Sequence, residues 1–147
     1  MQSSVPAFKL AFTARIAAVI TGPHALAYWG NPLPKGLPKE AALVGPTKSR
    51  DLVWRGGMTQ ANETYEIEVV VSVLGPIQKS QEELLTRAYA LNDLIISDVI
   101  GAWKALDYGG VVDIVLPGSA TDAELIDDAG KDREARITQS YSVTAKI

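Results

Sequence analysis

A strictly alternating stretch at residues 137–147 constrains the fold more than any other part of the chain. Apolar residues recur at every second position, interrupted only by Gln139, and hydroxylated or basic residues stand between them. The apolar set comprises Ile137, Tyr141, Val143, Ala145 and Ile147. Successive side chains of a strand point to opposite faces of its sheet, so the pattern predicts a half-buried antiparallel strand of about ten residues.

Residues 63–74 repeat this pattern and predict the longest strand. Its inner face holds Tyr65, Ile67, Val69, Val71 and Val73. Its outer face is mixed, because Val70 and Leu74 interrupt a series of polar side chains. We expect that part of this outer face meets an apolar surface. Shorter strands are predicted at 25–29, 51–55 and 112–116.

Two segments have helical spacing. Residues 7–19 place apolar side chains three or four positions apart, after Pro6, which suits a first helical turn. Residues 80–106 begin with Ser80 and Glu83, the spacing of a capping box. The apolar stripe that follows is wide, which predicts packing against more than one surface.

The order of these elements predicts the fold class. Strands are grouped on both sides of one long helix, which favours an α+β domain over a doubly wound sheet. We expect one domain, 1–147, with a mixed or antiparallel sheet of about four to six strands packed against the long amphipathic helix and a short N-terminal helix. Residues 31–46 contain four prolines and predict an extended loop with little regular structure.

Composition excludes several classes of function. The chain has no cysteine, which removes disulfides, thiolate zinc sites and cysteine nucleophiles. Its net charge of −3 argues against a dedicated nucleic-acid binder. Lys9 and the apolar residues after it have the outline of a signal peptide, but Arg15 interrupts the apolar run. No membrane span is expected.

Motifs for chemistry are weak. His24 is the only histidine and has no cysteine to join it, so we interpret it as a turn residue rather than a catalytic or metal-binding one. Residues 45–49 contain glycine, lysine and serine but not in the spacing of a phosphate-binding loop. We expect no catalytic residue, no metal ion and no cofactor.

Acidic residues cluster at 122–134, and we interpret this stretch as a solvated loop. The alternatives are a weak divalent-ion site, a subunit contact, or the active site of a small hydrolase. The cluster comprises Asp122, Glu124, Asp127, Asp128, Asp132 and Glu134. A calcium loop would need a different order of ligands. Residues 35–55 are weakly basic by contrast.

The layout resembles the tail terminator, or tail completion, proteins of long-tailed bacteriophages. The resemblance rests on the N-terminal helix, the strand at 65–71, the amphipathic helix at 80–106, and the closing strand after residues 133–136. It implies a small α+β protein without enzymatic activity that forms a homohexameric ring. Such a ring caps the tail tube and joins it to the head-side connector, and DNA passes through its lumen without specific binding. The implied location is the virion, with assembly in the host cytoplasm.

Physical reasoning supplies candidate interface residues, because the family has no strict motif. They lie in the Pro-rich loop, the turn at 56–58 and the outer face of the 63–74 strand. The set is Trp29, Lys35, Lys39, Arg55, Met58, Val70 and Leu74. Alternatives are another neck or tail component, such as a head-closure protein or tube subunit, and a monomeric ligand-binding module.

Overall fold

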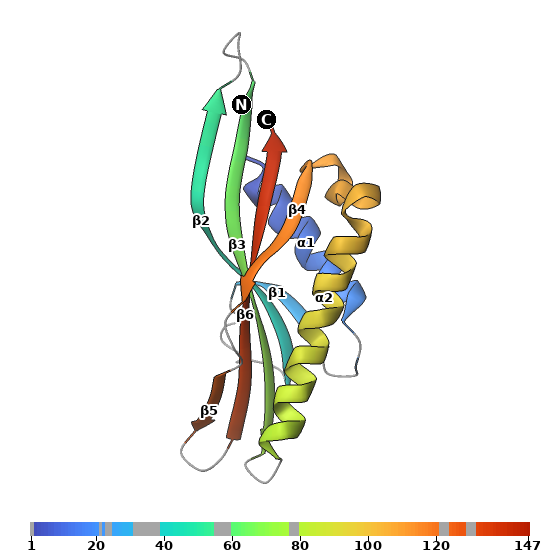
Figure 1. The fold of residues 1–147 in the computed structure, drawn as a ribbon, viewed down its shortest axis with the longest axis vertical. Coiled ribbons are helices and arrows are strands. Elements are labelled where there is room, and N and C mark those ends of the chain that lie inside the picture. The colour runs from blue at the N-terminus through green and yellow to red at the C-terminus, as the bar shows by residue number, and fades with distance from the viewer. Residues whose placement is uncertain are drawn as a thin grey trace.

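The computed structural model describes residues 2–20, 22, 25–30, 39–54, 60–76, 80–120, 124–128 and 132–147. Within these ranges the protein has two helices and a six-stranded mixed sheet, in the order α1, β1, β2, β3, α2, β4, β5 and β6. The sheet is long and twisted, and the two helices lie side by side against it (Figure 1). The predicted α+β class, with one long and one short helix, is confirmed.

The two strands predicted from alternation form the centre of the sheet. β3 (Ala61–Pro76) and β6 (Asp132–Lys146) pair antiparallel along their whole length, from Asn62 opposite Lys146 to Pro76 opposite Asp132. At about 3.3 Å per residue these strands are roughly 50 Å long, far beyond the usual five or six residues. The other strands pair with these two directly or through β2, and the two helices pack against the resulting sheet.

The remaining strands extend this pair on both sides. β2 (Glu40–Trp54) pairs antiparallel with β3, and β1 (Ala25–Trp29) lies parallel outside the first part of β2. β4 (Ile114–Ala120) and β5 (Glu124–Asp128) both pair with the far side of β6. One edge of the sheet is thus formed by β1 and the end of β2, and the other by β4 and β5.

The core lies between the sheet and the helices α1 (Val5–Val19) and α2 (Gln81–Gly110). Phe12 of α1 packs against the sheet, because its ring lies 5.3 Å from that of Tyr141 in β6. On its own helix the ring of Phe12 lies 5.1 Å from that of Phe8. Each buried aromatic or branched aliphatic side chain contributes about 1.5–3 kcal/mol. Fully buried members include Phe8, Phe12, Ile16, Ile67, Val71, Leu84, Leu91, Ile95, Ile137 and Tyr141.

Helix α2 begins as the capping pattern predicts. The Glu83 backbone nitrogen donates to Ser80 Oγ at 3.2 Å, which satisfies one of the unpaired donors of the first turn. The helix continues to Gly110, four residues beyond the predicted end at residue 106. Trp103 continues the apolar stripe of this helix in sequence, but its side chain is outside the described part of the chain.

The prediction of an extended loop at 31–46 is wrong for residues 40–46, which belong to β2. Pro46 is compatible with the strand at this position. It lies at a register shift between Val44 and Thr47, just past the last residue paired with β1. A missing N–H therefore costs no ladder hydrogen bond at this position. Residues 31–38 lie outside the described ranges.

The prediction of a loop at 122–134 is wrong for residues 124–128 and 132–134, since β5 and the start of β6 form two paired strands there. Acidic residues are poor strand formers, but here the register sets Glu124 opposite Arg136 and Asp127 opposite Arg133. The strand predicted at 51–55 is the end of β2, and β4 runs past the predicted stop at Pro117 through a register shift.

Candidate functional site

Three places in the described structure combine unusual chemistry with a defined geometry. They are an open groove at the start of α2, a smaller groove at the end of β1, and a buried carboxylate at the start of β3. Each could in principle serve binding or catalysis. The hydrogen-bond partners of the charged groups decide what each can do.

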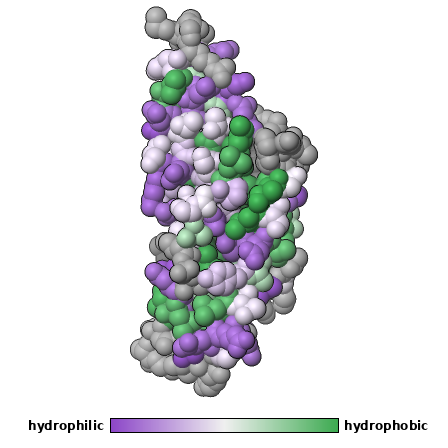
Figure 2. Space-filling model, viewed as in Figure 1, coloured by the Kyte–Doolittle hydropathy of each residue, from purple (hydrophilic) through white to green (hydrophobic). Residues whose placement is uncertain are grey.

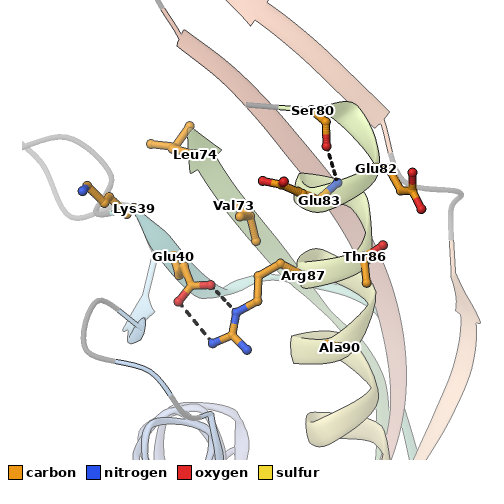
Figure 3. A pocket seen from close by; sticks show the side chains of 10 residues that line it. All are labelled: Lys39, Glu40, Val73, Leu74, Ser80, Glu82, Glu83, Thr86, Arg87 and Ala90. Carbon is orange, nitrogen blue, oxygen red and sulfur yellow. Dashed lines mark hydrogen bonds and ion pairs between the residues drawn. The ribbon is translucent and has the colours of Figure 1, made fainter. Parts of the chain in front are cut away.

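The first groove has a volume of about 950 Å³ and opens between the first turns of α2 and the adjoining ends of β2 and β3 (Figure 3). Leu74 and Val73 supply apolar wall, and Lys39 and Glu82 stand at opposite sides of the opening. The other lining residues are Glu40, Ser80, Glu83, Thr86, Arg87 and Ala90.

An ion pair spans this groove. Arg87 Nε donates to Glu40 Oε2, and Arg87 Nη2 donates to Glu40 Oε1 at 3.2 Å. The hydrogen bond to Glu40 raises the pKa of Arg87, partly opposed by burial. The pair ties the start of β2 to α2, and it neutralises both charges. This contact is a structural tie between the two elements.

Gly22 passes close to the same pair. Its φ of +138° is a conformation that side-chain-bearing residues rarely adopt. A Cβ here would lie 2.8 Å from Arg87 Nη2 and 3.0 Å from Glu40 Oε1. Glycine is therefore favoured at this position chiefly by its backbone conformation, and a larger residue would also have to displace the Arg87 guanidinium.

The second groove, which we call the Lys9 groove, lies where β1 ends. It has a volume of about 370 Å³ and is lined by Lys9, Trp29, Gly30, Leu43, Val44, Gly45, Pro46 and Val70. The backbone of Gly30 donates to Val44 at 3.0 Å, and Lys9 Nζ donates to the carbonyl oxygen of Gly45 at 2.8 Å. Gly45 is the first residue of β2 after the last one paired with β1, and Lys9 thus satisfies its carbonyl oxygen.

Lys9 is an unusual residue for this position, because its side chain belongs to α1 and is only 7% exposed. Burial lowers the pKa of Lys9. Among the described residues, no carboxylate lies within ion-pair distance of its ammonium group. A buried cation without a counterion costs stability, so the Lys9 groove is the described place most in need of a negatively charged partner.

The third place is a buried carboxylate. Glu63 is 0% exposed and accepts hydrogen bonds from Ser3 Oγ at 2.7 Å, Ser4 N at 2.8 Å, Ser4 Oγ at 2.6 Å and Arg50 Nε at 2.6 Å. Tyr65 lies beside it, with its hydroxyl 3.0 Å from Ser4 Oγ. The cluster fastens the N-terminal segment to β3 and β2.

The protonation states of this cluster follow from its contacts. Burial alone would raise the pKa of Glu63, but the hydrogen bonds from Ser4, Ser3 and Arg50 outweigh it, so the pKa is lowered. Burial raises the pKa of Tyr65 to about 12. At neutral pH Glu63 is therefore ionised and saturated with donors, which suits a structural tie rather than proton transfer.

Four of the seven predicted interface residues are described, and they divide between the two grooves. Lys39 and Leu74 line the first groove, and Trp29 and Val70 line the Lys9 groove. Lys35, Arg55 and Met58 lie outside the described ranges, as does His24.

The acidic stretch and the glycine–lysine segment show no arrangement for chemistry in the described part of the chain. Glu134 accepts from Arg136 Nε at 2.8 Å and from Ser72 Oγ at 3.0 Å. Lys48 pairs with Glu68 at 2.6 Å on neighbouring strands. No cluster of three potential metal ligands occurs among the described side chains.

Sequence reasoning missed Glu63, Lys9 and the Glu40–Arg87 pair. The signal for Glu63 was present, because strand alternation sets it on the same face as Tyr65 and Ile67. The signal for Lys9 was weaker: it lies one residue after Phe8 and three before Phe12, at the margin of the apolar stripe. The Glu40–Arg87 pair joins distant segments and carries no local signal.

No protein-family model matches the chain, and no curated protein matches it significantly. None of the described helical residues form a segment long and apolar enough to span a membrane.

Proposed function

We propose that this protein is a structural virion component that acts as a phage tail terminator. In this proposal six copies form a ring that caps the tail tube and joins it to the head-side connector, and the protein catalyses no reaction. The resemblance in layout motivates the proposal. The distribution of apolar and charged residues over the edges of the sheet supports it.

The observation that carries the proposal is that two edge strands, β1 and β4, contain no charged residue. Leu26 and Trp29 of β1 are 49% and 50% exposed, and Leu116 of β4 is 49% exposed. Figure 2 shows hydrophobic surface at mid-height, where β4 lies in Figure 1. Apolar side chains exposed on both edges of one sheet favour a partner on each side.

The position of these strands favours a ring over a simple pair. β1 and β4 lie on opposite edges of the sheet and differ in sequence. A subunit with two different contact surfaces can bind one neighbour on each side, which is the requirement for a closed ring.

Helix α2 offers a further surface for the tube or the connector. Tyr89, Ile96 and Ile100 are seven and four residues apart and so share one face of the helix. Tyr89 and Ile100 are exposed, which leaves apolar surface on this face of the helix.

Charge supports passage of DNA without capture. Each subunit carries a net charge of −3, so a ring is strongly acidic overall. We expect Asp and Glu to outnumber Lys and Arg among side chains that face the lumen, because such a lumen repels phosphate. A ring structure with a basic lumen would contradict this expectation.

A tube subunit is the alternative that a specific observation favours, because the central strands β3 and β6 are longer than the strands predicted at 63–74 and 137–147. Negative-stain electron microscopy of the purified protein separates the two. Isolated rings support a terminator, and stacked tubes support a tube subunit. Gene neighbourhood provides an independent check, since a terminator gene is expected beside genes for head closure and the tail tube.

A further inference from the structure

The Lys9 groove has the chemistry to bind a carboxylate next to an apolar side chain. An ammonium group has three donor hydrogens, and in the described structure the Gly45 carbonyl accepts one of them at 2.8 Å. The indole of Trp29 and the side chains of Leu43 and Val70 supply apolar wall beside it. A partner that fills this groove must bring both a negative charge and an apolar group.

Strand β5 presents that combination on the opposite edge of the sheet. Glu124 and Ile126 are two residues apart, so they share one face of the strand at a spacing of roughly 7 Å, and both are exposed. Arg136 lies opposite Glu124 in register, but its guanidinium donates to Glu134 at 2.8 and 3.2 Å. Glu124 has no ion-pair partner among the described residues.

The sequence has a contrast in charge between the segments around the two edges. Residues 31–55 contain five Lys or Arg against two Asp or Glu, whereas residues 121–134 contain six Asp or Glu against two Lys or Arg. Of the described members of the basic stretch, Lys48 and Arg50 are paired within the subunit with Glu68 and Glu63. The charge complementarity of the contact therefore rests on Lys9 and Glu124, and opposite charges of this kind steer association.

We propose that β5 of one copy docks at the Lys9 groove of the next copy, with Glu124 bound to the Lys9 ammonium and Ile126 packed against Trp29. This contact rests on the proposed ring and specifies the surfaces that form it. It joins unlike surfaces, so each subunit donates one β5 and offers one groove. The groove has room for side chains only. In the proposed contact, the uncharged edge strands β1 and β4 supply the rest of the surface buried between the two copies.

A mixing experiment tests the contact. Trp29→Asp blocks the groove, and the double change Glu124→Lys with Ile126→Lys blocks β5; all three side chains are exposed, so both variants are expected to fold. Native mass spectrometry and light scattering should find each variant monomeric alone. An equimolar mixture should form a heterodimer and nothing larger, because it retains one intact groove and one intact β5.

A charge control separates the specific contact from general electrostatics. Glu124→Lys alone should weaken association by about 30-fold or more, since it places two cations together at the groove. Asp93→Lys, an exposed residue of α2, makes the same change in net charge and should leave association within about threefold. Urea unfolding of every variant verifies that the fold is retained.

Each outcome decides between the two proposals. A wild-type ring whose blocked variants also form rings would overturn this contact and leave the ring intact. Wild-type protein that stops at dimers, together with a heterodimer from the mixture, would support the contact and contradict the ring. A groove-blocked variant that stays monomeric while the β5-blocked variant dimerises alone would overturn the contact, because that result indicates pairing of like surfaces. Wild-type protein that remains monomeric would contradict both.

Discussion

Glu63 accepts hydrogen bonds from both the backbone nitrogen and the hydroxyl of Ser4, at 2.8 and 2.6 Å, although 59 positions separate the two residues in sequence. Ser4 immediately precedes α1 and Glu63 lies near the start of β3. The pair therefore fixes where the first helix begins on the sheet. Because the Lys9 groove contains a side chain from that helix, the same tie positions Lys9.

Replacement of Glu63 should strongly destabilise the fold. In Glu63→Gln, an amide group replaces one carboxylate oxygen and faces the Ser4 and Arg50 donors, which leaves buried groups unpaired. We expect a loss of about 2–4 kcal/mol in the free energy of unfolding, measured by urea denaturation. Glu66→Gln, the same change at an exposed position of β3, should cost less than about 0.5 kcal/mol. Equal effects in the two variants would contradict the role of the cluster.

The stability of the protein should fall in acid partly through Glu63. Its pKa in the folded protein is below the usual value of 4.5. A lowered folded pKa contributes stability that is present above the unfolded pKa and is lost as pH falls through the folded one. The difference in unfolding free energy between wild type and Glu63→Gln should therefore shrink below about pH 4.5. A difference that stays constant from neutral to acidic pH would show that Glu63 is not ionised in the fold.

Two glycine substitutions should have opposite effects. Gly22→Ala strains the backbone and brings Cβ within 2.8 Å of Arg87, so we expect a loss of about 1–3 kcal/mol. Gly101→Ala lies within α2, where a Cβ meets nothing within 4 Å, and should gain about 0.5–1 kcal/mol. Thermal melts of the two variants give this comparison directly, and a stabilised Gly22→Ala would refute the geometry described for Gly22.

Removal of the Lys9 charge should not destabilise the isolated subunit. Burial without a counterion penalises the ammonium, so Lys9→Met should leave the unfolding free energy unchanged or raise it by up to about 2 kcal/mol at neutral pH. The stability of the wild type should also rise with pH between the lowered folded pKa and the usual 10.5, and this rise should be absent from Lys9→Met.

Lys48→Met is the control for Lys9→Met. Lys48 is half-exposed and paired with Glu68, so its loss should change stability by less than about 1 kcal/mol with no special pH dependence. A large destabilisation of Lys9→Met would identify the residue as a purely structural cap of the Gly45 carbonyl.

Local pattern predicted the parts of the fold whose signals are local. The alternation at 137–147 and 63–74 and the Ser80 cap correctly predicted β6, β3 and the start of α2. Residues 40–46 and β5 were missed because their stability comes from neighbours. Pro46 is tolerated because β1 has ended, and β5 is held by its pairing with β6, which no local pattern of β5 reveals.

The site residues were harder to predict for the same reason. Trp29 was proposed because it stands just before the Pro-rich loop, and Val70 because it interrupts a polar strand face. Lys9 is brought to them by the packing of α1 against the sheet. No spacing rule connects residue 9 with residues 29 and 70. Only the folded arrangement reveals a buried cation between them.

The mass of the assembled wild-type protein tests the central claim most directly. Native mass spectrometry over a concentration series, with negative-stain images of the same samples, should find closed rings of six subunits of 15.7 kDa each. Protein that remains at the mass of one subunit up to its solubility limit, with no ring in the images, would contradict the account.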